Sequence, residues 1–96
     1  MGPTWRRVTE HAAWGPRMWS AAAVYAGRIW VIGGYDNVNH RNLGDVWYTE
    51  DGKKWNELRT AHTFSARHEP TLYVFKNALW LVAGNAWPVQ NDVWRL

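Results

Sequence analysis

The chain of 96 residues contains no cysteine. Disulfides, thiolate nucleophiles and thiolate metal sites are therefore excluded, and the cellular compartment stays open. No apolar run approaches the roughly 20 residues that a membrane helix needs. The first residues, Met1–Trp5, also contain no apolar stretch of the kind found in a signal peptide. We therefore expect a soluble protein with no membrane partner.

Motifs that carry catalysis are also missing. The sequence has no G-x-S-x-G, no phosphate-binding loop and no pair of catalytic carboxylates. Its four histidines share no motif, and none of their spacings is that of a zinc site. The net charge of +3 is spread along the chain, which is a weak signal for nucleic acid. We expect no enzymatic activity, no cofactor, no metal and no nucleic-acid partner.

Tryptophan is abundant instead, with nine residues, and six of them recur in register between the two halves of the chain. Two pairs are 50 residues apart and the third is 47 apart, so one loop of the second copy is three residues shorter. A fixed period near 50 residues indicates a repeat architecture. We predict structural or interface roles for all six: Trp5 with Trp55, Trp30 with Trp80, and Trp47 with Trp94.

Each copy has the pattern of short strands, and no long window shows apolar residues at helical spacing. Residues 20–25 and 71–75 each end at a turn signal, and apolar residues follow at once, which predicts a hairpin. Residues 29–32 are all apolar, which is typical of a strand buried on both faces, and Gly33-Gly34 is expected to close it. Val46–Tyr48 and Trp55–Leu58 are expected as the third and fourth strands of the first copy.

Four short antiparallel strands per period are typical of a propeller blade. The Gly-Gly pair after an apolar strand, and the tryptophan that opens the fourth strand, resemble the kelch-repeat family. The segment DVWYTEDGKKW at 45–55 is similar to bacterial kelch-type repeats that carry D-V-W-Y-S-x-D-G-x-x-W. The resemblance covers about residues 5–96 and implies an all-β chain of two kelch-type four-stranded blades. Ala83-Gly84 replaces the Gly-Gly of the pattern, so we expect a slightly different turn there.

The strands of the second copy are offset along the chain. Its first three strands precede Leu96, and its fourth is matched by Trp5–Val8 at the opposite end of the sequence. We therefore expect residues 1–10 to form an outer strand donated to a neighbouring chain, residues 11–60 the first blade, and residues 61–96 a second blade lacking its outer strand. Both a natural two-repeat gene and an engineered fragment would look like this.

Self-assembly is the first function that this arrangement predicts. Two blades cannot close a ring, and 47% hydrophobic residues is too high for two blades standing alone. Chains would join head to tail into a closed propeller. Propellers have about four to eight blades. Six is the size that the family resemblance favours, so a homotrimer is expected, with an eight-bladed homotetramer as the alternative.

Arg17 and Arg67 precede the innermost strand of each blade, and His68 follows the second of them. In a closed ring the guanidiniums could surround the channel mouth and bind a small anion or carboxylate. The alternative is that each arginine holds loop carbonyls or stacks on a tryptophan. His68 is a candidate ligand residue at the same mouth, with a surface or polar-network role as its alternative.

Trp19 and Trp87 lie outside the repeat and are the other candidate ligand residues. An aromatic side chain in a loop can stack on a sugar ring or anchor a partner. Our first hypothesis is a self-assembling scaffold without catalysis, and the alternative is a lectin-like, anion-binding or small-ligand-binding protein. A mutarotase-like or epimerase-like enzyme rests on fold analogy alone.

Overall fold

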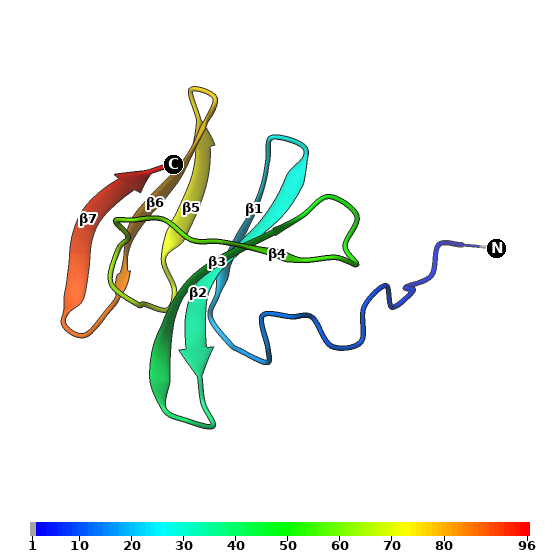
Figure 1. Cartoon of the computed structure of the whole chain (residues 1–96), viewed down its shortest axis with the longest axis horizontal. Coiled ribbons are helices and arrows are strands. Elements are labelled where there is room, and N and C mark those ends of the chain that lie inside the picture. The colour runs from blue at the N-terminus through cyan, green and yellow to red at the C-terminus, as the bar shows by residue number, and fades with distance from the viewer. Residues whose placement is uncertain (1) are drawn as a thin grey trace.

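A computed structural model describes residues 2–96, which form seven strands in two antiparallel sheets that lie next to each other (Figure 1). The first sheet has the strand order β1-β2-β3-β4 and the second the order β5-β6-β7. The predicted all-β chain with two antiparallel sheets is confirmed. The strands are β1 (Ala21–Tyr25), β2 (Arg28–Asp36), β3 (Arg41–Thr49), β4 (Asn56–Leu58), β5 (Thr71–Phe75), β6 (Ala78–Asn85) and β7 (Val89–Arg95).

Each sheet begins with a tight hairpin, as predicted. The turn between β1 and β2 consists of Ala26 and Gly27, and the turn between β5 and β6 consists of Lys76 and Asn77. All four residues have positive φ, between 49° and 72°. Two consecutive left-handed residues match the right-handed twist of the flanking strands, so these turns hold the hairpins in register. None of residues 2–96 belongs to a helix that could cross a membrane.

The prediction that Gly33-Gly34 closes the second strand is wrong. β2 continues to Asp36, and its pairing with β3 resumes after a register shift between Ile32 and Gly34. β6 has the same irregularity between Val82 and Gly84. The paired glycines therefore form a bulge inside a long strand, which bends the strand without ending it.

Ala83 shows that the expected difference in turn geometry is also wrong. Its φ of 57° is close to the 65° of Gly33, so both copies bulge in the same way. The environments differ, however. A Cβ at Gly33 would lie 2.6 Å from the backbone oxygen of Arg67, in the segment that leads to β5, so only glycine fits there. Ala83 occupies the matching position of the second sheet with its methyl group present, so alanine is accommodated there.

The core lies between the two sheets. Trp30 and Ile32 of β2 pack against Leu79 and Leu81 of β6, and all four side chains are buried. The indole nitrogen of Trp30 donates a hydrogen bond of 3.0 Å to the backbone oxygen of Tyr25, so its polar atom is satisfied inside the core.

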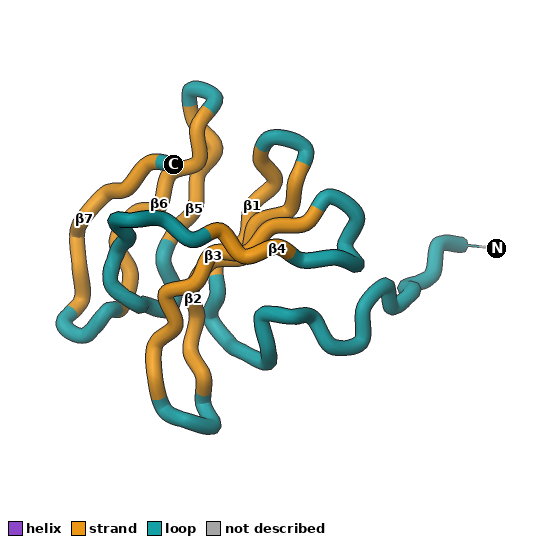
Figure 2. Tube along the Cα trace, viewed as in Figure 1, coloured by secondary structure: helices purple, strands orange, loops and turns teal. Residues whose placement is uncertain are grey.

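Residues 2–20 contain no strand and run along the outside of the first sheet to reach β1 (Figures 1 and 2). Thr9 anchors this segment by donating a 2.6 Å hydrogen bond to the backbone oxygen of Gly52, whereas the side chain of Trp5 is fully exposed. β4 covers the outer edge of β3, but no described strand covers the outer edge of β7. Trp5–Val8 is thus unpaired within this chain, and its donation to a neighbour stays a prediction.

Candidate functional site

Arg67 is the most buried charged residue of the chain, with an exposed fraction of 0%. Its two terminal nitrogens donate to the carboxylate of Asp92, at 2.6 and 3.0 Å. Further bonds go to the backbone oxygens of Ala83 and Ser65, at 2.9 and 3.0 Å. A buried charge needs a partner and saturated hydrogen bonding, and both are present here.

Arg17 repeats this arrangement in the first sheet. Its guanidinium donates to both carboxylate oxygens of Asp45, at 2.6 and 2.9 Å, and to the backbone oxygens of Gly33 and Trp14. Both predicted anion-binding arginines are therefore paired inside their own sheets instead of forming an open ring. The alternative, in which each arginine holds loop carbonyls, describes their geometry.

A tryptophan completes each arginine–aspartate pair. The indole nitrogen of Trp47 donates to Asp45 at 2.8 Å, and that of Trp94 donates to Asp92 at 2.9 Å. Hydrogen bonds from Arg67 and Trp94 lower the pKa of Asp92 from 3.8 to about 2. Burial raises the pKa of Asp45, but hydrogen bonds from Arg17 and Trp47 outweigh that effect and lower it.

These two carboxylates predict a loss of stability in acid. Each has a lower pKa in the folded chain than in the unfolded chain, so the ionised form favours folding. This stabilisation is complete above the ordinary value of 3.8 and is lost as the pH falls towards about 2. We expect the melting temperature, followed by circular dichroism, to fall steeply in this window. Asp92→Asn should melt lower at neutral pH and show a shallower acid limb, and an unchanged acid limb would contradict the assignment.

Two apolar sheet faces remain uncovered in this chain. On the second sheet, Tyr73, Phe75, Val82 and Val93 lie with Trp80 on the side away from the first sheet, and Tyr73, Phe75 and Val93 are more than half exposed. We call this side the distal face. Each residue of the distal face is equivalent in the repeat to a first-sheet residue that packs on the second sheet. The equivalent pairs are Ala23 with Tyr73, Tyr25 with Phe75, Trp30 with Trp80, Ile32 with Val82, and Val46 with Val93.

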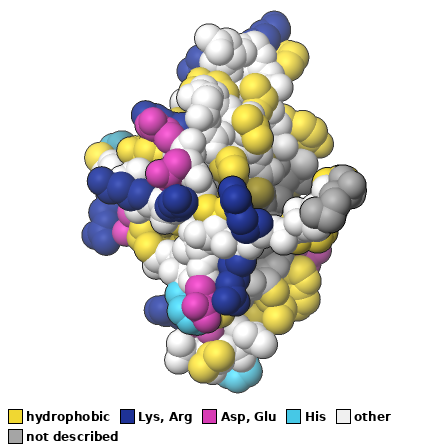
Figure 3. Space-filling model, turned by 90° about the vertical axis from the view of Figure 1, so that its right-hand side faces the viewer, with side chains coloured by type: hydrophobic (Ala, Val, Ile, Leu, Met, Phe, Trp, Pro, Cys, Tyr) yellow, Lys and Arg dark blue, Asp and Glu magenta, His cyan; other side chains and the backbone are white. Residues whose placement is uncertain are grey.

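The first sheet exposes the complementary side, which we call the proximal face. Val24 and Ile29 lie on it and are 71% and 45% exposed. Ile29 matches Leu79 of the second sheet, which is buried against the first sheet. The expectation that residues 29–32 are buried on both faces therefore fails at Ile29 within a single chain. Figure 3 looks at this side of the molecule, where exposed hydrophobic side chains lie among basic ones.

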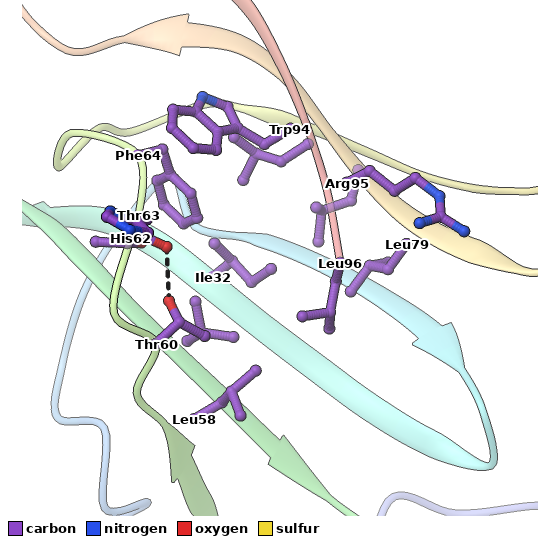
Figure 4. A pocket seen from close by; sticks show the side chains of 13 residues that line it. Ile32, Leu58, Thr60, His62, Thr63, Phe64, Leu79, Trp94, Arg95 and Leu96 are labelled. Atoms are coloured by element: carbon purple, nitrogen blue, oxygen red, sulfur yellow. Dashed lines mark hydrogen bonds between the residues drawn. The ribbon is translucent and has the colours of Figure 1, made fainter.

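A cavity of about 170 Å³ opens between the two sheets near the uncovered edge of β7 (Figure 4). Leu58, Phe64 and Trp94 are among the side chains that line it. The ring centroids of Phe64 and Trp94 lie 6.2 Å apart. In the first sheet the residue that matches Phe64 is Trp14, which packs edge-on against Trp55 at 5.6 Å. The residue that matches Trp55 in the repeat is Trp5, which has no such contact in this chain.

The cavity therefore lies beside Phe64, next to the edge of β7 that no described strand covers. The residues that line it are Ile32, Val46, Leu58, Thr60, His62, Thr63, Phe64, Leu72, Leu79, Leu81, Trp94, Arg95 and Leu96. Most of these are apolar; Thr60, His62 and Thr63 come from the segment that joins β4 to β5, and Arg95 comes from the end of β7. Such a lining is suited to an aromatic side chain rather than to a charged ligand.

Two of the predicted ligand residues meet at one end of the junction between the sheets. The rings of Trp19 and His68 lie 5.1 Å apart, and Tyr35 lies 5.9 Å from Trp19. Asn42 binds the ring of His68 at 2.6 Å, and the backbone nitrogen of Glu69 donates to the backbone oxygen of Trp19 at 2.7 Å. We call these five residues the Trp19 cluster.

Tyr35, Asn42 and Glu69 were not identified as site residues from the sequence. A usable signal existed, because Tyr35 is matched by Asn85 and Trp19 by Glu69, so the two copies differ at these positions. The remaining candidate, Trp87, is 84% exposed in the loop between β6 and β7 and makes none of the ring contacts of the Trp19 cluster. Residues 2–96 contain no group of three or more His, Asp or Glu that could hold a metal ion.

Residues 20–60 match the family model described as the kelch motif. The matched segment contains the whole first sheet, from β1 to β4, and the bulge at Gly33. No curated protein matches the chain.

Proposed function

The chain carries a kelch motif at residues 20–60 and belongs to the kelch-repeat family, and from this we propose that it acts as a scaffold that assembles head to tail into a closed β-propeller. The observation that carries the proposal is the match between the distal face and the side of the first sheet that packs on the second. One interface within the chain already buries these positions. The same interface can form between the distal face of one copy and the proximal face of the next.

Such an interface is heterologous, because two different surfaces of the same chain meet. On the distal face, Trp80 would take the place that Trp30 has in the core, and Phe75 the place of Tyr25. On the proximal face, Ile29 would take the place of Leu79. Large apolar side chains that are exposed in one copy would then be buried at every junction, which favours association.

The outer strand supports the same direction of assembly. Trp5–Val8 of a second copy could pair with the uncovered edge of β7, as β4 pairs with β3. In that position Trp5 would lie against Phe64, as Trp55 lies against Trp14. The segment that follows, anchored by Thr9 at Gly52, would then lead from one copy to the next as residues 59–70 lead from β4 to β5. Three copies would give six blades, and four copies would give eight.

The test uses one substitution on each face. Phe75→Glu places a charge on the distal face and Val24→Glu places one on the proximal face, while Val38→Glu in the exposed turn after β2 is the control. By light scattering and native mass spectrometry, we expect the unmodified chain and Val38→Glu to form a closed oligomer. Each face variant alone should be monomeric, because a buried unpaired charge costs several kcal/mol.

Mixing the two face variants distinguishes head-to-tail assembly from other kinds. Each variant keeps one intact face, so the Phe75→Glu chain offers its proximal face to the distal face of the Val24→Glu chain. The mixture should form a dimer of the two chains and nothing larger. An unmodified chain that remains monomeric as its concentration is raised, or a mixture that forms larger rings, would contradict the proposal.

A further inference from the structure

Glu69 is the one acidic side chain among residues 2–96 that has neither an arginine partner nor a hydrogen bond from a backbone N–H. Among residues 2–96, each of the other seven acidic side chains has an arginine partner or accepts backbone N–H bonds. Six of them pair with arginine: Glu10, Asp36, Asp45, Glu50, Glu57 and Asp92. Asp51 accepts from the backbone nitrogens of Lys53 and Lys54. Glu69 has only the ring of His68, whose Nε2 lies 3.8 Å from its carboxylate.

His68 offers a second hydrogen-bond acceptor, its Nε2, next to the carboxylate of Glu69. The side-chain nitrogen of Asn42 donates to the backbone oxygen of Asn85 at 3.1 Å, so the side-chain oxygen of Asn42 is the atom that accepts from His68. In the neutral form of the ring, Nδ1 of His68 therefore carries the proton and Nε2 is a free acceptor. The carboxylate of Glu69 and this nitrogen are both acceptors, so a ligand between them must donate.

Trp19 adds a flat apolar surface next to these two acceptors. Trp19 is 51% exposed, and its ring centroid lies 5.1 Å from that of His68 and 5.9 Å from that of Tyr35. Its φ of 58° lies in the left-handed region, which is costly for a bulky residue. Glu69 has the matching position and a φ of 55°, so the conformation belongs to the repeat, but the tryptophan does not. Blade geometry alone therefore does not account for tryptophan at this position.

We propose that the Trp19 cluster binds a planar organic cation, namely a guanidinium group such as an arginine side chain. A guanidinium has only donors, arranged as a planar fork that matches a carboxylate, and it stacks on aromatic rings. Glu69 supplies the carboxylate, His68 the second acceptor, and Trp19 the stacking surface. The site lies between the two sheets of one chain, so it does not depend on assembly.

The experiment uses Nα-acetyl-arginine amide as the probe and the indole N–H signals of the ¹⁵N-labelled protein as the readout. The Trp19 signal is assigned by its loss in Trp19→Phe. We expect saturable shifts of the Trp19 signal with the arginine probe and none with Nα-acetyl-citrulline amide, which has the same shape without the charge. The signal of Trp87, which is also exposed, should not move.

Two carboxylate variants test the role of Glu69. Glu69→Gln should weaken binding of the arginine probe about tenfold, or about 1.4 kcal/mol. Glu50→Gln is the control, because its side chain is similarly exposed, at 68% against 62%, and lies elsewhere on the chain. Equal shifts with the citrulline probe would overturn recognition of the charge. Shifts with methyl glucoside in place of the arginine probe would overturn the proposal in favour of a sugar site, as would an unchanged affinity in Glu69→Gln.

Discussion

Trp30→Ala is expected to lower the free energy of unfolding of the chain by about 3–5 kcal/mol, a large fraction of its total stability. The side chain is 3% exposed, stacks on Tyr48 at 5.1 Å and belongs to the cluster that joins the two sheets. Truncating a buried tryptophan costs about 3–5 kcal/mol, whereas a domain of this length has a stability of roughly 5–15 kcal/mol. The measurement is urea unfolding, followed by circular dichroism at a protein concentration low enough to keep the chain monomeric.

Trp80→Ala is the matched control, because it truncates the same repeat position in the second sheet. Trp80 lies on the distal face, packs 6.1 Å from Phe75 and is only partly buried. Its truncation should cost the monomer much less than the truncation of Trp30 does. An equal loss of unfolding free energy in both variants would mean that the distal face is already covered within one chain.

Removing residues 2–8 is expected to abolish assembly while the two sheets stay folded. These residues form no strand and are exposed in the single chain, so their loss removes few internal contacts. Each junction of the ring would lose the strand that pairs with β7 and the tryptophan that fills the cavity beside Phe64. Burial of one large aromatic residue is worth about 3–5 kcal/mol, and the loss is repeated at every junction.

The control for this deletion keeps the length of the segment. A variant in which residues 2–8 are replaced by glycine and serine retains the chain length but has no tryptophan and no strand-forming residues. It should be monomeric by light scattering and should keep the β-sheet circular dichroism spectrum of the unmodified chain. An oligomer of unchanged mass in either variant would show that the outer strand is not donated.

The hairpins could be predicted from the sequence because their signals are local. Residues 20–25 and 71–75 end at short turns whose residues accept positive φ, and apolar residues follow immediately. The extension of β2 beyond Gly33-Gly34 could not be predicted in the same way. The residues that follow Gly34 are mostly polar, which is typical of a loop. Only the pairing of Gly34 with Leu43 across the sheet shows that the strand continues.

The candidate sites were less predictable, because they join residues that are far apart in the sequence. Arg17 and Asp45 are separated by 28 residues, so their pairing depends on the finished sheet. The recurrence of both arginines in the repeat was the better guide, since it indicates a role in every blade. The Trp19 cluster combines residues from separate segments, and its sequence signal was a difference between the two copies rather than a motif.

Ala83 has a consequence for how a ring of these chains would come apart. Within a chain, Gly33 lets the backbone of Arg67 approach to a distance that leaves no room for a methyl group. At the proposed junction between chains, the matching position carries the methyl group of Ala83, so the backbone of Arg17 of the next copy must stay farther away. The junction between the two sheets of one chain would then be packed more closely than the junction between neighbouring chains, and the two kinds would alternate around the ring. Mechanical or thermal opening would start at the junctions between chains and release whole chains, each with its own two sheets still joined.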